Sequence, residues 1–103
     1  MSKYNIAYTA TAKKDLVGIF EFVADYNYNF AVELRKTLDE KILLLTKSPF
    51  LGRPATNLKI AIDNSRITFC KPYIIFYSVD TAQNIIYIES VMHEAQENLD
   101  WIY

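Results

Sequence analysis

The sequence feature that most constrains the fold is the stretch Tyr73–Val79, which is apolar at nearly every position. A strand with one face in water alternates apolar and polar residues, whereas a strand covered on both faces is apolar throughout. Further strand patterns lie at residues 66–70 and 85–92, and the polar residues 80–84 precede the second of these. The sequence therefore predicts an antiparallel meander with Tyr73–Val79 as its central strand, covered on one face by helices and open to a partner on the other.

Two amphipathic helix patterns precede these strands. The first has Thr9 and Thr11 as candidate N-caps and ends near Tyr26, and the second follows residues 27–29 and ends before Pro49, which cannot continue a helix. The apolar stripes are Ala12, Leu16, Ile19, Phe20 and Val23 in the first helix and Ala31, Leu34, Leu38, Ile42 and Leu45 in the second. Because few residues join the helices, we expect an antiparallel hairpin with both stripes on a common core.

The remaining segments predict smaller elements. Residues 3–9 alternate with Tyr4, Ile6 and Tyr8 on one side, which is the period of a half-buried strand. Residues 49–57 are expected to form a loop, 58–62 a weak strand and 94–103 a short third helix. The predicted fold is α+β: an N-terminal strand, an antiparallel two-helix hairpin, and a mainly antiparallel four- to five-stranded sheet with a short C-terminal helix, in a single domain over residues 1–103.

Composition restricts the class of protein. Half of the 103 residues are apolar, which is enough for one hydrophobic core. The N-terminus lacks the pattern of a secretion signal, and no stretch approaches the roughly 18 apolar residues that span a bilayer, so we expect a cytoplasmic protein without membrane contact. Cys70 is the sole cysteine and His93 the sole histidine, too few for a structural zinc site, and we expect neither a metal nor a cofactor.

Charge is distributed unevenly along the chain. All eleven Lys and Arg residues lie at or before Lys71, and the charged residues after it are acidic. Proteins that bind nucleic-acid phosphates depend on Lys and Arg for much of their affinity. The final strands are therefore poorly suited to hold RNA.

Several short motifs, in this order and spacing, resemble the ParE/RelE superfamily of bacterial toxins. They are Tyr8-Thr9 before the first helix, Pro49 with Gly52-Arg53-Pro54, Arg66, the apolar run Tyr73–Tyr77, and Val91-Met92-His93. The resemblance covers nearly the whole chain. It implies the toxin of a type II toxin-antitoxin module, a class that includes plasmid stabilisation proteins, held inactive by a cognate ParD-like antitoxin in a hetero-oligomer.

Members of this superfamily differ in target, since ParE-like toxins act on DNA gyrase and RelE-like toxins cut messenger RNA on the ribosome. In a ribonuclease, Arg66 would hold charge on the phosphate, His93 would act as base or acid, and Tyr77 or Tyr87 would assist. By strand alternation, we expect His93 to share a face with Tyr87 and Glu89. The alternative roles are structural: a strand-end hydrogen bond for His93 and, for Arg66, an ion pair with Glu89 or Asp63.

The missing cations after Lys71 favour the ParE-like branch, which binds gyrase and needs no catalytic residue. In that branch Arg53, Arg66 and His93 are the candidate target contacts, although Arg53 could instead anchor its loop. ParE-like toxins often carry Arg after the histidine, whereas this chain continues with Glu94. An inactive family member that serves only as a binding module is a further alternative.

Four apolar residues lie off the helical stripes and are candidates for antitoxin contact. They are Phe22, Phe30, Leu43 and Leu44. The resemblance implies an antitoxin segment that wraps over apolar patches of the hairpin and sheet. The competing interpretation is that these residues widen the core-facing surface of the helices.

Overall fold

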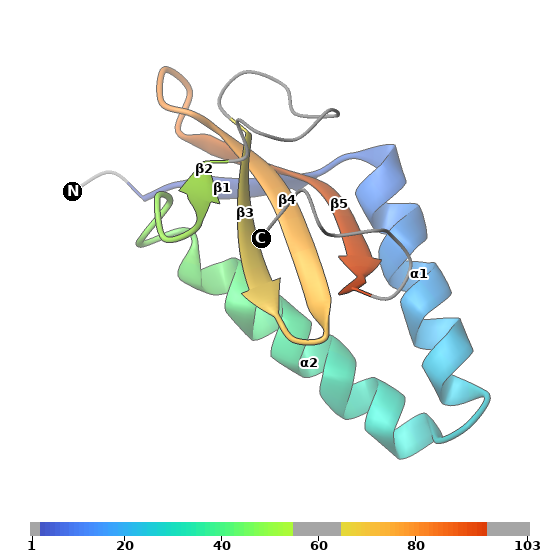
Figure 1. The fold of residues 1–103 in the computed structure, drawn as a ribbon. Helices are drawn as coiled ribbons and strands as arrows, with labels where there is room; N and C mark the ends of the chain where they lie inside the picture. The colour runs from blue at the N-terminus through green and yellow to red at the C-terminus, as the bar shows by residue number, and fades with distance from the viewer. Residues whose placement is uncertain (1–2, 55–64, 95–103) are drawn as a thin grey trace.

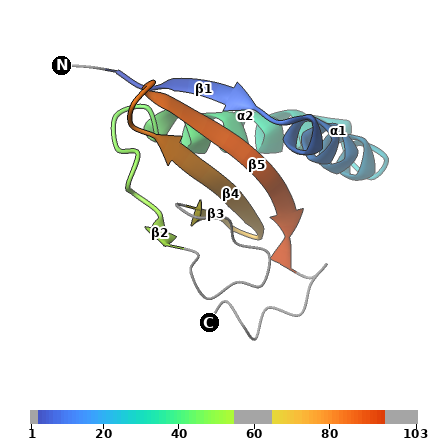
Figure 2. The same cartoon turned by 90° about the horizontal axis from the view of Figure 1, so that it is seen from above.

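The computed structural model describes residues 3–54 and 65–94, which form two helices and a five-stranded sheet. In chain order the elements are β1 (Asn5–Tyr8), α1 (Ala10–Ala24), α2 (Tyr28–Leu44), β2 (Arg53–Pro54), β3 (Ser65–Cys70), β4 (Tyr73–Asp80) and β5 (Ile85–His93). Figures 1 and 2 show both helices on one face of the sheet. The predicted α+β class, with a helical hairpin and a mainly antiparallel sheet, is confirmed.

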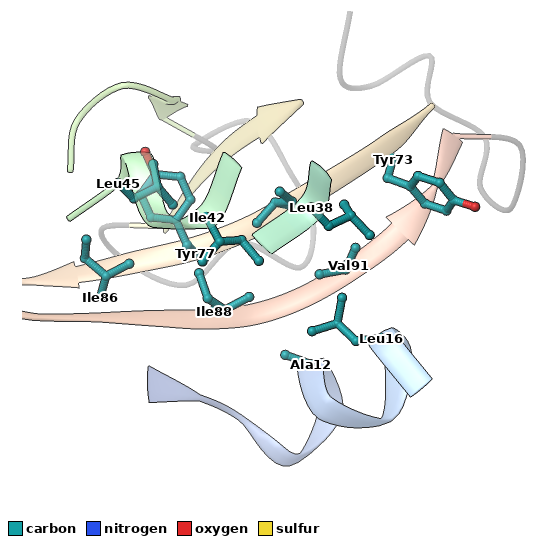
Figure 3. Close-up of a cluster of buried hydrophobic side chains, with 11 residues drawn as sticks. Ala12, Leu16, Leu38, Ile42, Leu45, Tyr73, Tyr77, Ile86, Ile88 and Val91 are labelled. Carbon is teal, nitrogen blue, oxygen red and sulfur yellow. The ribbon is translucent and has the colours of Figure 1, made fainter. Parts of the chain in front are cut away.

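The sheet has the strand order β1-β5-β4-β3-β2, so β4 is its central strand as expected. β1 runs parallel to β5, whereas the β5-β4, β4-β3 and β3-β2 pairs are antiparallel. Tyr73–Tyr77 are all buried, which explains why the run is apolar at each position. Tyr73, Ile75 and Tyr77 face the helices and join the main core, which is shown in Figure 3.

The hydrophobic core includes the predicted apolar stripe of α2 and the first half of the apolar stripe of α1. Ala31, Leu38, Ile42 and Leu45 are buried, as are Ala12 and Leu16. The later stripe residues of α1 are only half-buried. Figure 1 shows the reason, since the connected ends of the two helices extend beyond the sheet. The hairpin tip therefore has no sheet beneath it.

Polar side chains at the start of α1 fasten this helix to β5. Thr9 is the N-cap: its Oγ1 accepts from the Ala12 N–H at 3.0 Å and donates to the Glu89 carbonyl at 3.0 Å. Asp15 Oδ2 accepts from the Val91 N–H at 3.0 Å and from Ser90 Oγ at 2.8 Å. These bonds occupy the edge of β5 beyond the end of β1, where unpaired backbone groups would otherwise be exposed.

Turn residues close the meander. Asp80 Oδ1 accepts from the N–H groups of Ala82 and Gln83, and Asn84 has a positive φ of 57°, a conformation that asparagine tolerates better than most residues. A two-residue turn with a cis bond between Lys71 and Pro72 joins β3 to β4.

Three predictions about minor elements have different outcomes. The prediction that 49–57 is entirely loop is wrong at Arg53–Pro54, because these residues pair with Ile67 and Arg66 as β2. The weak strand at 58–62 and nearly all of the third helix at 94–103 lie outside the described residues. Neither described helix combines the length and the apolar character needed to cross a membrane.

Candidate functional site

Arg66 is bound to the loop that precedes β2. Its Nε donates to the Gly52 carbonyl at 3.0 Å, and its Nη2 donates to the Phe50 carbonyl at 3.2 Å and also to that of Gly52. The guanidinium carbon lies 5.2 Å from the centroid of the Phe50 ring, within the range of a cation–π contact. Glu89 instead accepts from Ser65 Oγ at 3.2 Å, and Asp63 lies outside the described residues. The guanidinium of the half-buried Arg66 is therefore bound to backbone carbonyls rather than to Glu89.

Tyr77 binds the backbone N–H of Gly52, the residue whose carbonyl binds Arg66. Its side chain is completely buried, and its hydroxyl accepts from the Gly52 N–H at 2.9 Å. A Cβ atom at position 52 would lie 2.3 Å from the Ile67 carbonyl oxygen and 2.8 Å from the Tyr77 hydroxyl, so only glycine fits. Gly52, Arg66 and Tyr77 form a unit that we call the Gly52 clamp.

Arg53 follows the Gly52 clamp directly and is exposed at the sheet edge. Its guanidinium carbon lies 5.6 Å from the centroid of the Phe69 ring. Leu51, Phe69 and Lys71 line a shallow hollow beside it. This edge thus combines two cations with exposed apolar surface.

His93 ends β5 at the opposite end of the sheet. Its ring packs edge-on against Tyr73, with centroids 5.1 Å apart and planes at 85°. The two rings line an open groove between α1 and β5, to which α1 contributes Asp15, Gly18 and Phe22, and which we call the α1–β5 groove. Burial raises the pKa of the Tyr73 hydroxyl above its ordinary value.

Arg66 and His93 do not come together. Arg66 pairs with Tyr77 and His93 pairs with Tyr73, so they lie four residues apart along β4 and on strands to either side of it. Strand rise and spacing then separate their backbones by about 16 Å. Because the Arg66 side chain is also bound to the Phe50–Gly52 loop, the two side chains cannot bracket one phosphodiester group.

A β-bulge breaks the strand alternation on which one prediction relied. The register between β4 and β5 shifts at Phe76/Tyr77, so that Ile88 opposes Tyr77 while Ser90 opposes Phe76. Val91 and His93 consequently face the helices, whereas Tyr87, opposite Ser78, faces the other side. The expected common face for His93 and Tyr87 is wrong, and nothing in the periodicity of β5 marks the bulge.

The four residues considered for RNA cleavage therefore lie in three places: Arg66 and Tyr77 meet at Gly52, His93 lines the α1–β5 groove and Tyr87 lies on the opposite face of the sheet. Within residues 3–54 and 65–94, no group of three His, Cys, Asp or Glu side chains is arranged to hold a metal ion. In this part of the chain the structure assembles a clamp and a groove rather than an acid–base set.

The four off-stripe residues of the helices are exposed. Phe22 is 63% exposed, Phe30 59%, Leu43 61% and Leu44 53%, so the interpretation that they widen the core-facing surface is wrong. Three of them line two separate grooves. Phe22 packs on Tyr26 and lines the α1–β5 groove, whereas Leu43 and Leu44 line a second shallow groove with Lys3, Lys41 and Lys47.

This fold and these motifs define a class of protein, the ParE/RelE-like toxins of type II toxin-antitoxin systems. The family model described as "ParE toxin of type II toxin-antitoxin system, parDE" matches residues 6–98. The chain therefore belongs to the ParE toxin family. A comparison with curated protein sequences finds no match.

Solved structures of toxin-antitoxin systems share the fold. A chain of the chromosomal ParDE system from P. aeruginosa superposes with a TM-score of 0.70 at 19% identity, covering 88% of this chain and 96% of that one. The RelBE2 complex of Mycobacterium tuberculosis gives a TM-score of 0.59 at 20% identity, covering 89% and 99%, respectively. The intact E. coli RelBE complex gives 0.60 at 16% identity, covering 87% and 95%. Each likeness establishes the shared fold.

Proposed function

We propose that this chain is a ParE-like toxin that inhibits DNA gyrase by binding it, and that a ParD-like antitoxin holds it inactive. The observation that carries the proposal is the separation of Arg66 from His93, together with the binding of the Arg66 guanidinium to the Phe50 and Gly52 carbonyls. Membership of the ParE toxin family points to the same target.

Cleaving RNA demands more than the described residues provide. A base must take the proton of the ribose hydroxyl, cations must hold the phosphate, and an acid must protonate the leaving oxygen, all around one phosphodiester. Tyr77 is completely buried and bonded to Gly52, and Tyr87 lies on the sheet face opposite His93. Inhibition by binding needs no such convergence, only a rigid surface with charge and apolar area.

The test of the target uses purified components. The chain is added to DNA gyrase and relaxed plasmid, and in parallel to ribosomes carrying a defined message; supercoiling, DNA cleavage and message length are measured. The proposal predicts lost supercoiling or trapped DNA breaks with intact message. Message cut at the ribosome with unaffected gyrase would instead establish the RelE-like alternative, and no effect on either would favour an inactive binding module.

A pair of matched variants sharpens this test. Arg53→Ala removes an exposed cation beside the Gly52 clamp and should weaken gyrase inhibition by about tenfold, the loss of one charge-assisted contact. Lys36→Ala removes an equally exposed cation on the outside of α2 and should leave inhibition unchanged. Equal effects of the two substitutions would contradict a specific contact at Arg53.

The antitoxin contact is proposed for the exposed apolar side chains of the helical hairpin. A contiguous apolar surface on a soluble protein marks an interaction site, and the α1–β5 groove brings Phe22, Ile19 and Tyr73 together along one open channel. An apolar antitoxin segment that covered this groove would bury side chains that are now solvated.

This contact is tested by titrating the chain with its ParD-like antitoxin. Phe22→Ser should weaken binding by at least tenfold, since a buried aromatic anchor contributes more than about 1.4 kcal/mol. Val17→Ser is the matched control, because Val17 is 54% exposed on the same helix yet does not line the groove. Unchanged affinity of the Phe22→Ser variant would exclude the groove as the antitoxin site.

A further inference from the structure

We infer that Arg66 and Tyr77 are positioning residues, which hold the Gly52 peptide groups so that Arg53 meets the target. The inference rests on the proposed function for the identity of the target, and on the Gly52 clamp for the mechanism. It separates two arginines that sequence reasoning treats alike, and it gives a buried tyrosine a part in target recognition.

Gly52 is hydrogen-bonded at both of its backbone polar groups. Its N–H is bonded to the Tyr77 hydroxyl on β4, and its carbonyl is bonded to the Arg66 guanidinium on β3. Both anchoring side chains come from the central part of the sheet, 25 and 14 residues away in sequence. A residue held at both backbone polar groups has little freedom at φ and ψ, so the direction of the chain entering β2 is fixed.

Gly52 also has no room for a side chain. A Cβ atom would overlap the Ile67 carbonyl oxygen, so the loop lies directly against β3. Burial and close packing add a steric limit to the two hydrogen bonds. Arg53 is the next residue along the chain and pairs with Ile67, which makes its position a direct consequence of the clamp.

The two arginines differ in how readily they can reach a partner. Arg66 is half-buried, and its Nε and Nη2 already donate to two backbone carbonyls, which restricts how its guanidinium can approach a carboxylate or phosphate. The Arg53 side chain is exposed, lies against Phe69 and borders a hollow with Lys71. A guanidinium held over an aromatic ring loses less conformational entropy on binding than a freely rotating one. Arg53 is thus the target contact, and Arg66 acts through it.

The clamp itself is tested without reference to function, by amide hydrogen exchange of the isolated chain. Tyr77→Phe removes only the hydroxyl that accepts from Gly52, and it should accelerate exchange at the Gly52 amide by about tenfold while leaving β4 and β5 amides protected. Tyr87→Phe, on the opposite face of the sheet, is the matched control and should leave Gly52 unchanged. Unaltered Gly52 exchange in the Tyr77→Phe variant would overturn the clamp.

The link to the target is tested by a double-mutant cycle on gyrase inhibition. Arg53→Ala and Tyr77→Phe should each weaken inhibition by about tenfold, and the double variant should be no weaker than Arg53→Ala alone, because Tyr77 acts through Arg53. Arg66→Lys, which keeps the charge but loses the planar fork, should behave as Tyr77→Phe does. Additive losses would overturn the inference, since a general loss of stability adds independently of Arg53.

The two ways of failing are distinguishable. If the wild-type chain leaves gyrase unaffected, the proposed function fails and the assignment of Arg53 to that target fails with it, while amide exchange still decides whether the clamp exists. If the wild-type chain inhibits gyrase but the cycle is additive, the function stands and the positioning role is wrong.

Discussion

The two ends of the helix-facing side of the sheet are built in opposite ways. At one end, Gly52 is bound through its N–H and its carbonyl and has no room for a side chain. At the other end, a Cβ atom added to Gly18 would meet no neighbouring atom within 4 Å, and this glycine lines the open α1–β5 groove beside His93. These are the two glycines of the chain: Gly52 lies where packing is close, and Gly18 lies where the structure is open.

One small fold thus has a closely packed loop at one end and an open groove at the other. The closed end relies on side chain–backbone bonds between distant segments, which fix the exposed Arg53. The open end leaves apolar rings exposed, where a partner can bury them. In the proposed function the first serves the target and the second serves the antitoxin.

The largest predicted effect comes from adding a side chain at Gly52, where the structure has no room for one. Gly52→Ala places a methyl group 2.3 Å from the Ile67 carbonyl oxygen, so backbone must move, and we expect a loss of about 3 kcal/mol in the free energy of unfolding. Urea unfolding followed by circular dichroism measures it. A loss below about 1 kcal/mol would contradict the tight packing assigned to this loop.

The matched substitution at the open end should have the opposite sign. Gly18→Ala adds a methyl group where the structure has space, in the interior of α1, and should raise the free energy of unfolding by about 0.8 kcal/mol. The same unfolding experiment compares both variants. Destabilisation by Gly18→Ala would contradict the open space that the structure shows around Gly18.

An intermediate effect is expected where α1 is fastened to β5. Asp15→Ala leaves the Val91 N–H and the Ser90 hydroxyl without their acceptor, and should cost about 2 kcal/mol because hydrogen bonds to a charged group are involved. Glu21→Ala on the exposed side of α1 is the control. If the two variants unfold at the same urea concentration, the Asp15 bonds contribute nothing to stability.

The smallest effect is a loss of stability at alkaline pH. Burial raises the pKa of the Tyr8 and Tyr73 hydroxyls above 10.0 and that of the Cys70 thiol above 9.0, although Lys41 partly offsets the effect at Cys70. A raised folded-state pKa contributes stability that is complete below the unfolded value and is lost as the pH rises through the folded one. The midpoint temperature of thermal unfolding should therefore be constant from pH 7 to about pH 8.5 and should fall above that pH.

Ultraviolet titration provides the matching spectroscopic measurement. Because burial raises the pKa of the Tyr73 hydroxyl, the Tyr73→Phe variant should lack part of the late absorbance change. If the Tyr73→Phe variant instead lacks absorbance from the early part of the titration, the burial assigned to the Tyr73 hydroxyl is contradicted.

Hydrophobic periodicity predicts the fold because each element buries a recognisable face. The stripes of both helices and the continuous apolar run of β4 mark core positions directly, and Thr9 and Asn27 cap the helices near the predicted starts. The end of α1 is harder to predict, since its later stripe residues have the right spacing but extend beyond the sheet.

The site is less predictable because it depends on contacts between distant segments. No local pattern shows that the Tyr77 hydroxyl binds Gly52, or that Arg66 binds carbonyls rather than a carboxylate. The bulge in β5 likewise arises from pairing with β4, and it moves His93 to the opposite face from the one that alternation predicts. Side-chain identity indicates candidate roles, whereas register decides which candidates meet.

The proposed inhibition of DNA gyrase is tested most directly by inducing this chain alone in bacteria and measuring DNA breaks and transcript integrity in the same culture. We expect growth arrest with DNA breaks and intact transcripts, and we expect co-expression of the antitoxin to restore normal growth. Arrest with cleaved transcripts and intact DNA would contradict the proposal and would mean that the separated Arg66 and His93 do not prevent RNA cleavage.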